Sequence, residues 1–187
     1  RNGIADRIIY TASDEFVKLR GGEPTVWDSQ ARAKAGEIDW DIGGDKSNLR
    51  GRASTTYYSQ KQTNGATPFS KVNSPVFVTA ENASFDHDEE TALYTGNARA
   101  WQGDNYVRAD KLYLQQKEGH LFAEGKVQSK LYNAAQTVGG RKSSSPVFAS
   151  AGKMLFYQKR NLLRYENDVD IRQGTDRIEA GVANVFL

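Results

Sequence analysis

Short runs of alternating apolar and polar residues recur along the chain, most clearly between residues 75 and 130. In the run 76–80, Val76, Val78 and Ala80 fall on one face, because successive side chains of a strand point to opposite sides. Glycine, asparagine and aspartate separate the runs, as in antiparallel strands joined by tight turns. No segment keeps a 3.6-residue apolar period, and residues 28–36 come nearest to one. The pattern therefore predicts an all-β chain built of antiparallel strands.

The pattern of residues 75–116 returns 71 positions later, so that Pro75 corresponds to Pro146 and Gln102 to Gln173. The N-terminal part fits the same pattern with an offset of 75 at first and 74 further on. We therefore predict three repeat units, at 1–74, 75–145 and 146–187, the last of them incomplete. Repetition at a fixed period indicates units stacked in one continuous array.

Each predicted strand has one apolar face, which indicates a sheet that closes on itself or on a second sheet. The parity of this face changes between Ala109 and Leu112, and this predicts a bulge or kink. Alanine recurs on the apolar face, and its small volume favours a groove that runs through the stacked units. The predicted groove-lining residues are Val76, Val78, Phe85, Tyr94, Ala98, Ala100, Val107, Ala109, Leu112, Leu114, Val147, Ala149, Phe156, Tyr165, Val169, Ile171, Ile178 and Ala180.

Composition narrows the classes of function. The mean hydropathy of −0.68 is low, which favours a thin β shell over a thick globular core. The net charge of +2 comes from 25 basic and 23 acidic residues spread without blocks, so nucleic acid is not an expected partner. The absence of cysteine excludes thiol catalysis and disulfides. No run approaches the roughly 18 apolar residues of a membrane span. The opening residues are not a natural start, so we expect a processed or excised segment.

The chain offers few groups for catalysis or metal binding. Residues 86–90 read Asp-His-Asp-Glu-Glu, but the equivalent residues 157–161 lack metal ligands, so we interpret the run as a solvated turn. We assign His120 to a turn as well. No phosphate-binding glycine loop and no nucleophile elbow occur. We expect no catalytic residue, no metal and no cofactor. Four basic residues could pair with phosphate groups of a ligand or form the wet face: Arg99, Arg108, Lys111 and Lys126.

Two long polar segments, 57–74 and 132–145, interrupt the repeats and end in Ser-Pro. We predict exposed loops, and their role is left open.

Several motifs resemble the OstA/LptA repeat of lipopolysaccharide transport proteins. They are 75–78 (Pro-Val-Phe-Val), 94–98 (Tyr-Thr-Gly-Asn-Ala), 102–103 (Gln-Gly) and 109–112 (Ala-Asp-Lys-Leu). The resemblance covers 75–187 well and 3–56 more loosely. It implies a β-jellyroll, shaped like a folded taco, whose apolar interior holds the acyl chains of lipid A. In the family, the residues matching Val76, Val78 and Phe156 meet lipid. The repeat occurs in LptA, LptC and the N-terminal domain of LptD, and these alternatives stay open. Unlike LptA, this chain has a further unit before Pro75.

The resemblance implies a periplasmic, non-enzymatic carrier that helps to move lipopolysaccharide from the inner to the outer membrane. A membrane tether outside this chain is left open. The implied partners are lipopolysaccharide, other Lpt-type jellyrolls and a second copy stacked head to tail. An exposed strand edge is a template for such pairing. One alternative is a lipid-free β-solenoid scaffold, whose core would contain ladders of large aliphatic side chains. Another is a polysaccharide-acting β-helix enzyme, which would need clustered catalytic carboxylates.

Overall fold

The computed structural model describes residues 2–63, 65–132 and 145–187, so most of the second predicted loop, 132–145, lies outside the described residues. The described chain is all β apart from two short 3-10 helices, which agrees with the alternation in the sequence. The strands are β1 Asn2–Ile4, β2 Arg7–Thr11, β3 Phe16–Arg20, β4 Thr25–Trp27, β5 Ala31–Lys34, β6 Glu37–Asp41, β7 Lys46–Tyr57, β8 Val76–Asp86, β9 Thr91–Gln102, β10 Asn105–Gln115, β11 His120–Leu131, β12 Val147–Tyr157, β13 Leu162–Gln173 and β14 Asp176–Phe186. The helices are η1 Gln60–Thr63 and η2 Gln158–Arg160.

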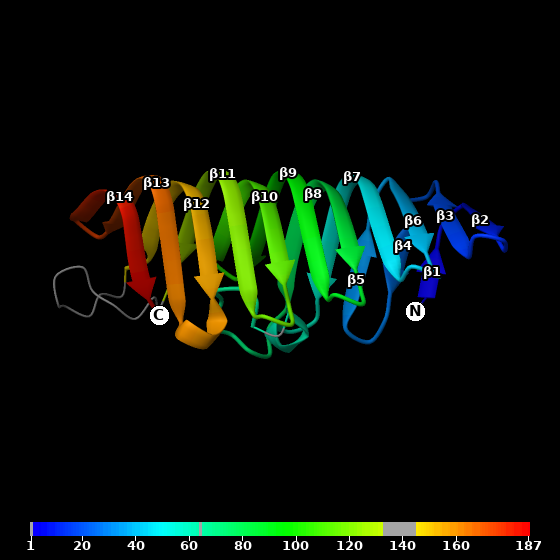
Figure 1. The fold of residues 1–187 in the computed structure, drawn as a ribbon, viewed down its shortest axis with the longest axis horizontal. Coiled ribbons are helices and arrows are strands. Elements are labelled where there is room, and N and C mark those ends of the chain that lie inside the picture. Colours follow the sequence, from blue (N-terminus) through cyan, green and yellow to red (C-terminus); the bar gives the residue numbers. More distant parts are fainter. Residues whose placement is uncertain (1, 64, 133–144) are drawn as a thin grey trace.

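All fourteen strands belong to one antiparallel sheet that is folded over into two layers (Figure 1). The first layer contains β2, β3 and β6, and the second contains β1, β4 and β5. Strand β7 joins the layers, because its first half pairs with β6 and its second half with β5. Strands β8 to β14 continue in the same way, with one half in each layer. The N- and C-termini lie at opposite ends of the long axis (Figure 1).

The long strands bend where the sheet passes from one layer to the other. The β8–β9 pairing shifts register between Thr79 and Asn82, opposite Gly96 and Asn97, which both have positive φ. Glycine adopts this conformation without steric cost, which makes a sharp bend possible. The β10–β11 register shifts between Arg108 and Lys111, and this confirms the bulge predicted between Ala109 and Leu112. The bends line one long edge of the molecule, and the opposite edge, where the turns lie, is called the mouth.

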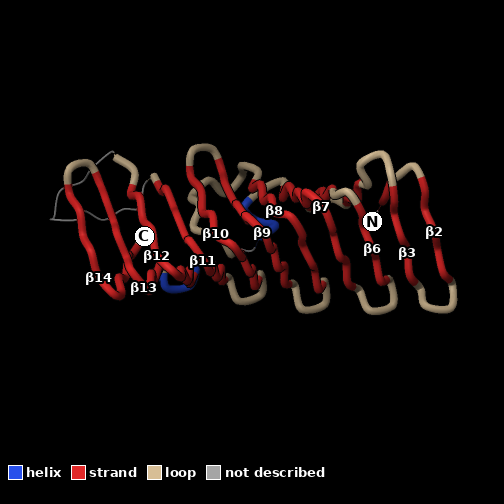
Figure 2. Tube along the Cα trace, turned by 90° about the horizontal axis from the view of Figure 1, so that it is seen from above, coloured by secondary structure: helices blue, strands red, loops and turns tan. Residues whose placement is uncertain are grey.

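The strand bounds follow the repeat offsets. Strands β8, β9 and β10 begin 71 residues before β12, β13 and β14, and β7 begins 74 residues before β11. In the N-terminal unit the bend interrupts the strands, so that β1 and β2, β3 and β4, and β5 and β6 each correspond to one later strand. Figure 2 shows the resulting row of strands, with β2, β3 and β6 beyond β7.

The apolar core lies between the layers, and both ends of the row leave apolar side chains exposed. Ile8 and Tyr10 are 53% and 59% exposed on β2, and Phe186 is 58% exposed on β14. Tyr10 is exposed because β2 pairs only with β3 and no described strand flanks its other side.

Candidate lipid-binding site

The predicted groove-lining residues mostly lie between the two layers. Phe85 and Ala180 are half-buried, and Ile178 is 40% exposed because it lies on the edge strand β14. The remaining members are buried: Val76, Val78, Tyr94, Ala98, Ala100, Val107, Ala109, Leu112, Leu114, Val147, Ala149, Phe156, Tyr165, Val169 and Ile171. Their contact with lipid stays a prediction, since burial alone is equally the property of a packed core.

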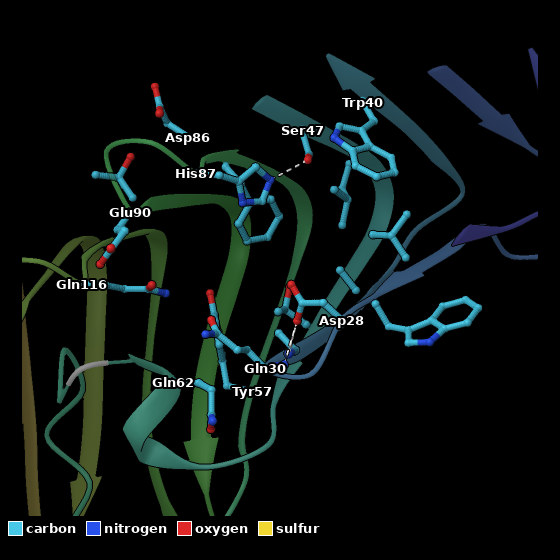
Figure 3. Close-up of a pocket in the computed structure, with 18 of the residues that line it drawn as sticks. Asp28, Gln30, Trp40, Ser47, Tyr57, Gln62, Asp86, His87, Glu90 and Gln116 are labelled. Carbon is cyan, nitrogen blue, oxygen red and sulfur yellow. Dashed lines mark hydrogen bonds between the residues drawn. The ribbon is translucent and has the colours of Figure 1, made fainter. Parts of the chain in front are cut away.

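A cavity of about 500 Å³ opens between the layers in the N-terminal third of the molecule (Figure 3). This volume falls within the range of small-molecule pockets, about 300–1,000 Å³. Its floor is apolar, with Ala33, Ile38 and Leu49 from β5, β6 and β7. Of the predicted groove-lining residues, Phe85 alone borders it. Its complete lining is Val26, Trp27, Asp28, Gln30, Ala31, Ala33, Ile38, Trp40, Ser47, Leu49, Thr55, Tyr57, Lys61, Gln62, Phe85, Asp86, His87, Glu90, Thr91 and Gln116.

Small side chains lie at two positions in the lining of this cavity. Ala33 and Ser47 in the N-terminal unit correspond to Val107 and Leu121 in the middle unit, by the 74-residue offset between β5 and β10 and between β7 and β11. Val107 and Leu121 are fully buried and fill the equivalent space. A comparison of aligned side-chain volumes singles out these two positions, but Leu49 in the same lining is larger than its equivalent Ala123, so volumes alone do not locate the cavity. The inner-face alternation alone does not locate it either, because alanine, serine, valine and leucine all fit it.

The rim of the cavity is polar and carries acidic groups. His87 Nε2 and Ser47 Oγ lie 2.9 Å apart in a hydrogen bond that crosses from the β8–β9 turn to β7 (Figure 3). The Asp86 carboxylate accepts a hydrogen bond from the Glu89 amide at 3.0 Å and lies 3.2 Å from Lys46 Nζ. These two interactions hold the pKa of Asp86 below its ordinary value. A site with an apolar floor and a hydrated rim can take up alkyl chains while a polar head stays in water.

Residues 86–90 form a turn, as interpreted from the sequence: β8 ends at Asp86 and β9 begins at Thr91. From the sequence we also assign His120 to a turn, but His120 is the first residue of β11. Its ring packs edge-on against the ring of Tyr157, with the two ring centroids 5.0 Å apart. Among the described residues, no group of three or more His, Asp or Glu side chains could hold a metal ion.

Two buried tyrosines, Tyr94 and Tyr165, connect the layers. The hydroxyls of Tyr94 and Tyr57 lie 3.2 Å apart, and those of Tyr165 and Ser129 lie 2.8 Å apart. Tyr94 and Tyr165 occupy equivalent positions in the first layer, whereas Tyr57 and Ser129 lie in the second. Burial raises the pKa of Tyr165 to about 12, and the hydrogen bond with Ser129 opposes this shift. Burial likewise raises the pKa of Tyr94 well above its usual range. Both hydroxyls are therefore neutral at physiological pH and serve as interlayer hydrogen bonds.

Residues 77–164 match the family model described as LptA/(LptD N-terminal domain) LPS transport protein. The chain therefore contains an OstA/LptA-like domain. The crystal structure of LptH from Pseudomonas aeruginosa, the LptA homologous periplasmic component of the conserved lipopolysaccharide transport device, has a similar fold. The TM-score is 0.54 at 12% sequence identity, and the match covers 76% of this chain and 90% of LptH. No curated protein sequence matches the chain.

The OstA/LptA-like match begins in β8, so most of the cavity-lining strands precede it. The fold comparison covers more of the chain and supports the β-jellyroll that the resemblance implies. None of the helices in the described part of the chain has the length and apolar character needed to span a membrane.

Proposed function

We propose that this protein is a non-enzymatic periplasmic carrier that binds lipopolysaccharide by its acyl chains and helps to move it towards the outer membrane. The observation that carries the proposal is the 500 Å³ cavity with an apolar floor between the two layers. The OstA/LptA-like domain supports lipopolysaccharide as the cargo. Burial of alkyl chains contributes roughly 0.8 kcal/mol per CH₂, so an apolar interior can bind them without a hydrogen-bonding anchor.

The charges at the rim of the cavity favour transient over permanent binding of lipopolysaccharide. Asp28, Asp86 and Glu90 lie there with Lys61, and Lys46 forms an ion pair with Asp86 beside the lining. The phosphates of a lipid headgroup are repelled by carboxylates, and this weakens attachment at the rim. The acyl chains then provide most of the binding, and release requires no ion pair to break.

Partner proteins would add strands at the two exposed edges. Ile8 and Tyr10 on β2, and Val182 and Phe186 on β14, present apolar side chains next to unpaired strand edges. Strand addition at such edges gains both backbone hydrogen bonds and apolar contact. The proposed partners are other Lpt-type jellyrolls or a second copy of this chain.

The proposal is tested by site-specific photocrosslinking with purified lipopolysaccharide. A photoreactive residue at Ala33 points into the cavity, and the matched control at the neighbouring Arg32 lies exposed on the same strand. We expect a lipid adduct at position 33 at least tenfold stronger than at position 32. A second pair, Val78 and Arg99, applies the same comparison to the fully buried middle unit. Equal labelling at positions 33 and 32, or none at either in the folded protein, would contradict lipid binding and favour the lipid-free scaffold.

A further inference from the structure

The connection between β7 and β8, residues 58–75, is unusual because part of it is buried. Thr63, Ala66, Thr67 and Phe69 are each 5% exposed or less. Loops normally run over the surface. The Phe69 ring instead belongs to the same apolar core cluster as the inward-facing side chains of the strands. This segment, called the lid below, is thus seated between the layers at the mouth, beneath the middle of the sheet (Figure 1).

One side of the lid is tied to the second layer. The side chain of Gln102, at the end of β9, accepts a hydrogen bond from the Lys71 amide at 3.0 Å. The same side chain donates to the Lys71 carbonyl at 2.7 Å and to the Ser74 carbonyl at 3.0 Å. Gln102 is 1% exposed, so these three hydrogen bonds are shielded from water.

The other side of the lid reaches the first layer. A Cβ atom built on Gly65 would lie 3.0 Å from Cγ of Gln158, the first residue of η2. Gln158 in turn donates its amide hydrogen to the Gly119 carbonyl at 3.0 Å. Gly119 and Gln158 lie in the β10–β11 and β12–β13 turns, which border the first layer. The lid therefore leaves the second layer, crosses the mouth and returns.

The lid also marks where the open interior ends. Lys61 and Gln62 of η1 line the cavity. Leu114, Leu121 and Phe156, on neighbouring strands of the adjoining first layer, are 3% exposed or less and do not border it. The described structure therefore has an open N-terminal compartment and a closed central one, with the lid at their boundary.

We propose that the 58–75 lid gates the passage of acyl chains from the N-terminal cavity into the central interior. Acyl chains first occupy the cavity, and they reach the space around Leu121 only after Phe69 leaves the core and the lid detaches from Gln102 and Gln158. This inference rests on the proposed function. It adds a gate at the boundary between the open cavity and the packed central interior.

A reversible disulfide tests the gate, because the chain contains no cysteine of its own. In the double variant Gly65→Cys and Gln158→Cys, the sulfur at 158 takes the place of Cγ and lies within bonding reach of the thiol at 65. Gly65 has a φ of +74°, so a cysteine there is strained in both the oxidised and the reduced protein. The reduced double variant is therefore the matched control. A photoreactive residue at Leu49 then reports on the cavity and one at Leu121 on the central interior.

With purified lipopolysaccharide, we expect oxidation to lower the adduct at position 121 at least tenfold while the adduct at position 49 stays unchanged. Reduction should restore labelling at 121. Phe69→Ala, introduced without the two cysteines, loosens the lid and should raise the labelling at position 121. Unchanged labelling at 121 in the oxidised protein would overturn the gate, whereas loss of labelling at position 49 in every form would overturn lipid binding itself.

Hydrogen exchange gives a second readout without a photoreactive residue in the core. Lipopolysaccharide should accelerate exchange of the amides of residues 66–67 and 69–71 in the reduced protein by at least tenfold, and the oxidised lock should abolish this acceleration. Slower or unchanged exchange on lipid addition would contradict lid release.

Discussion

At the scale of single residues, the interior combines apolar packing with a few paired hydroxyls. Tyr94 and Tyr165, 71 residues apart, each form a hydrogen bond between their hydroxyl and a hydroxyl in the opposite layer. A buried polar group without a partner is costly, whereas a satisfied pair fixes the relative position of the groups it joins. These pairs therefore fix the separation of the layers, one of them at the cavity wall through Tyr57 and the other between Tyr165 and Ser129.

Tyr165→Phe should reduce the free energy of unfolding by about 1–3 kcal/mol near neutral pH, because it leaves the buried Ser129 hydroxyl without this partner. The difference in free energy of unfolding between the wild type and this variant should diminish as the pH rises above about 10. In the wild type, the unfolded state then ionises Tyr165 near pH 10, but the folded state does so only at about 12. Urea unfolding of both proteins from pH 7 to 11 measures this difference. A pH-independent gap would contradict the burial of the hydroxyl.

At the scale of elements, the bend in each long strand is what turns one sheet into two layers. Gly96 in β9 has a φ of +82°, and a Cβ atom there would lie 2.5–2.7 Å from side-chain atoms of Glu81 on β8. The strand thus requires glycine both for its backbone conformation and for the close approach of its neighbour.

Gly96→Ala should destabilise the fold by about 1–2 kcal/mol, the cost of a left-handed conformation for an L-residue. Gly181→Ala in β14 is the matched control, because a Cβ atom there meets no heavy atom within 4 Å and no positive φ is required. The control should stay within about 0.5 kcal/mol of wild type. Thermal or urea unfolding compares the two, and equal effects would show that the bend tolerates a side chain.

The sequence predicts the strands of this protein but neither its cavity nor the burial of its lid. The period-two alternation and the 71-residue offset follow from the geometry of a strand, so they predict the elements of the middle and C-terminal units and the bulge near Asp110. The cavity lies between two layers far apart in the sequence, and its lining includes small side chains at Ala33 and Ser47, whose volume alternation does not measure. The burial of Phe69 depends on a loop folding back, and no local period encodes this, so the sequence predicted only an exposed loop.

At the scale of the whole molecule, the two ends of the row of strands are apolar and the middle is closed. Ile8→Lys on β2 and Phe186→Lys on β14 place a charge beside an exposed edge, which opposes strand addition. Each should weaken self-association about tenfold or more by analytical ultracentrifugation. Val72→Lys, at a similarly exposed site in the 58–75 lid, is the control and should have no effect. Association unaffected by either edge variant would exclude these edges as the contact.

The strand order also gives the molecule a polarity. The path through the second layer has eleven strands, counting β1 and β14 at its ends. Each strand is antiparallel to the next, so the first and the last point in the same direction. An identical copy added end to end in the same orientation therefore meets β14 with a parallel strand. A different jellyroll, whose edge strand runs the opposite way, can instead complete an antiparallel ladder. Parallel pairing is slightly less stable per residue. The odd number of strands therefore favours an assembly that alternates this chain with a different jellyroll over an assembly of identical copies.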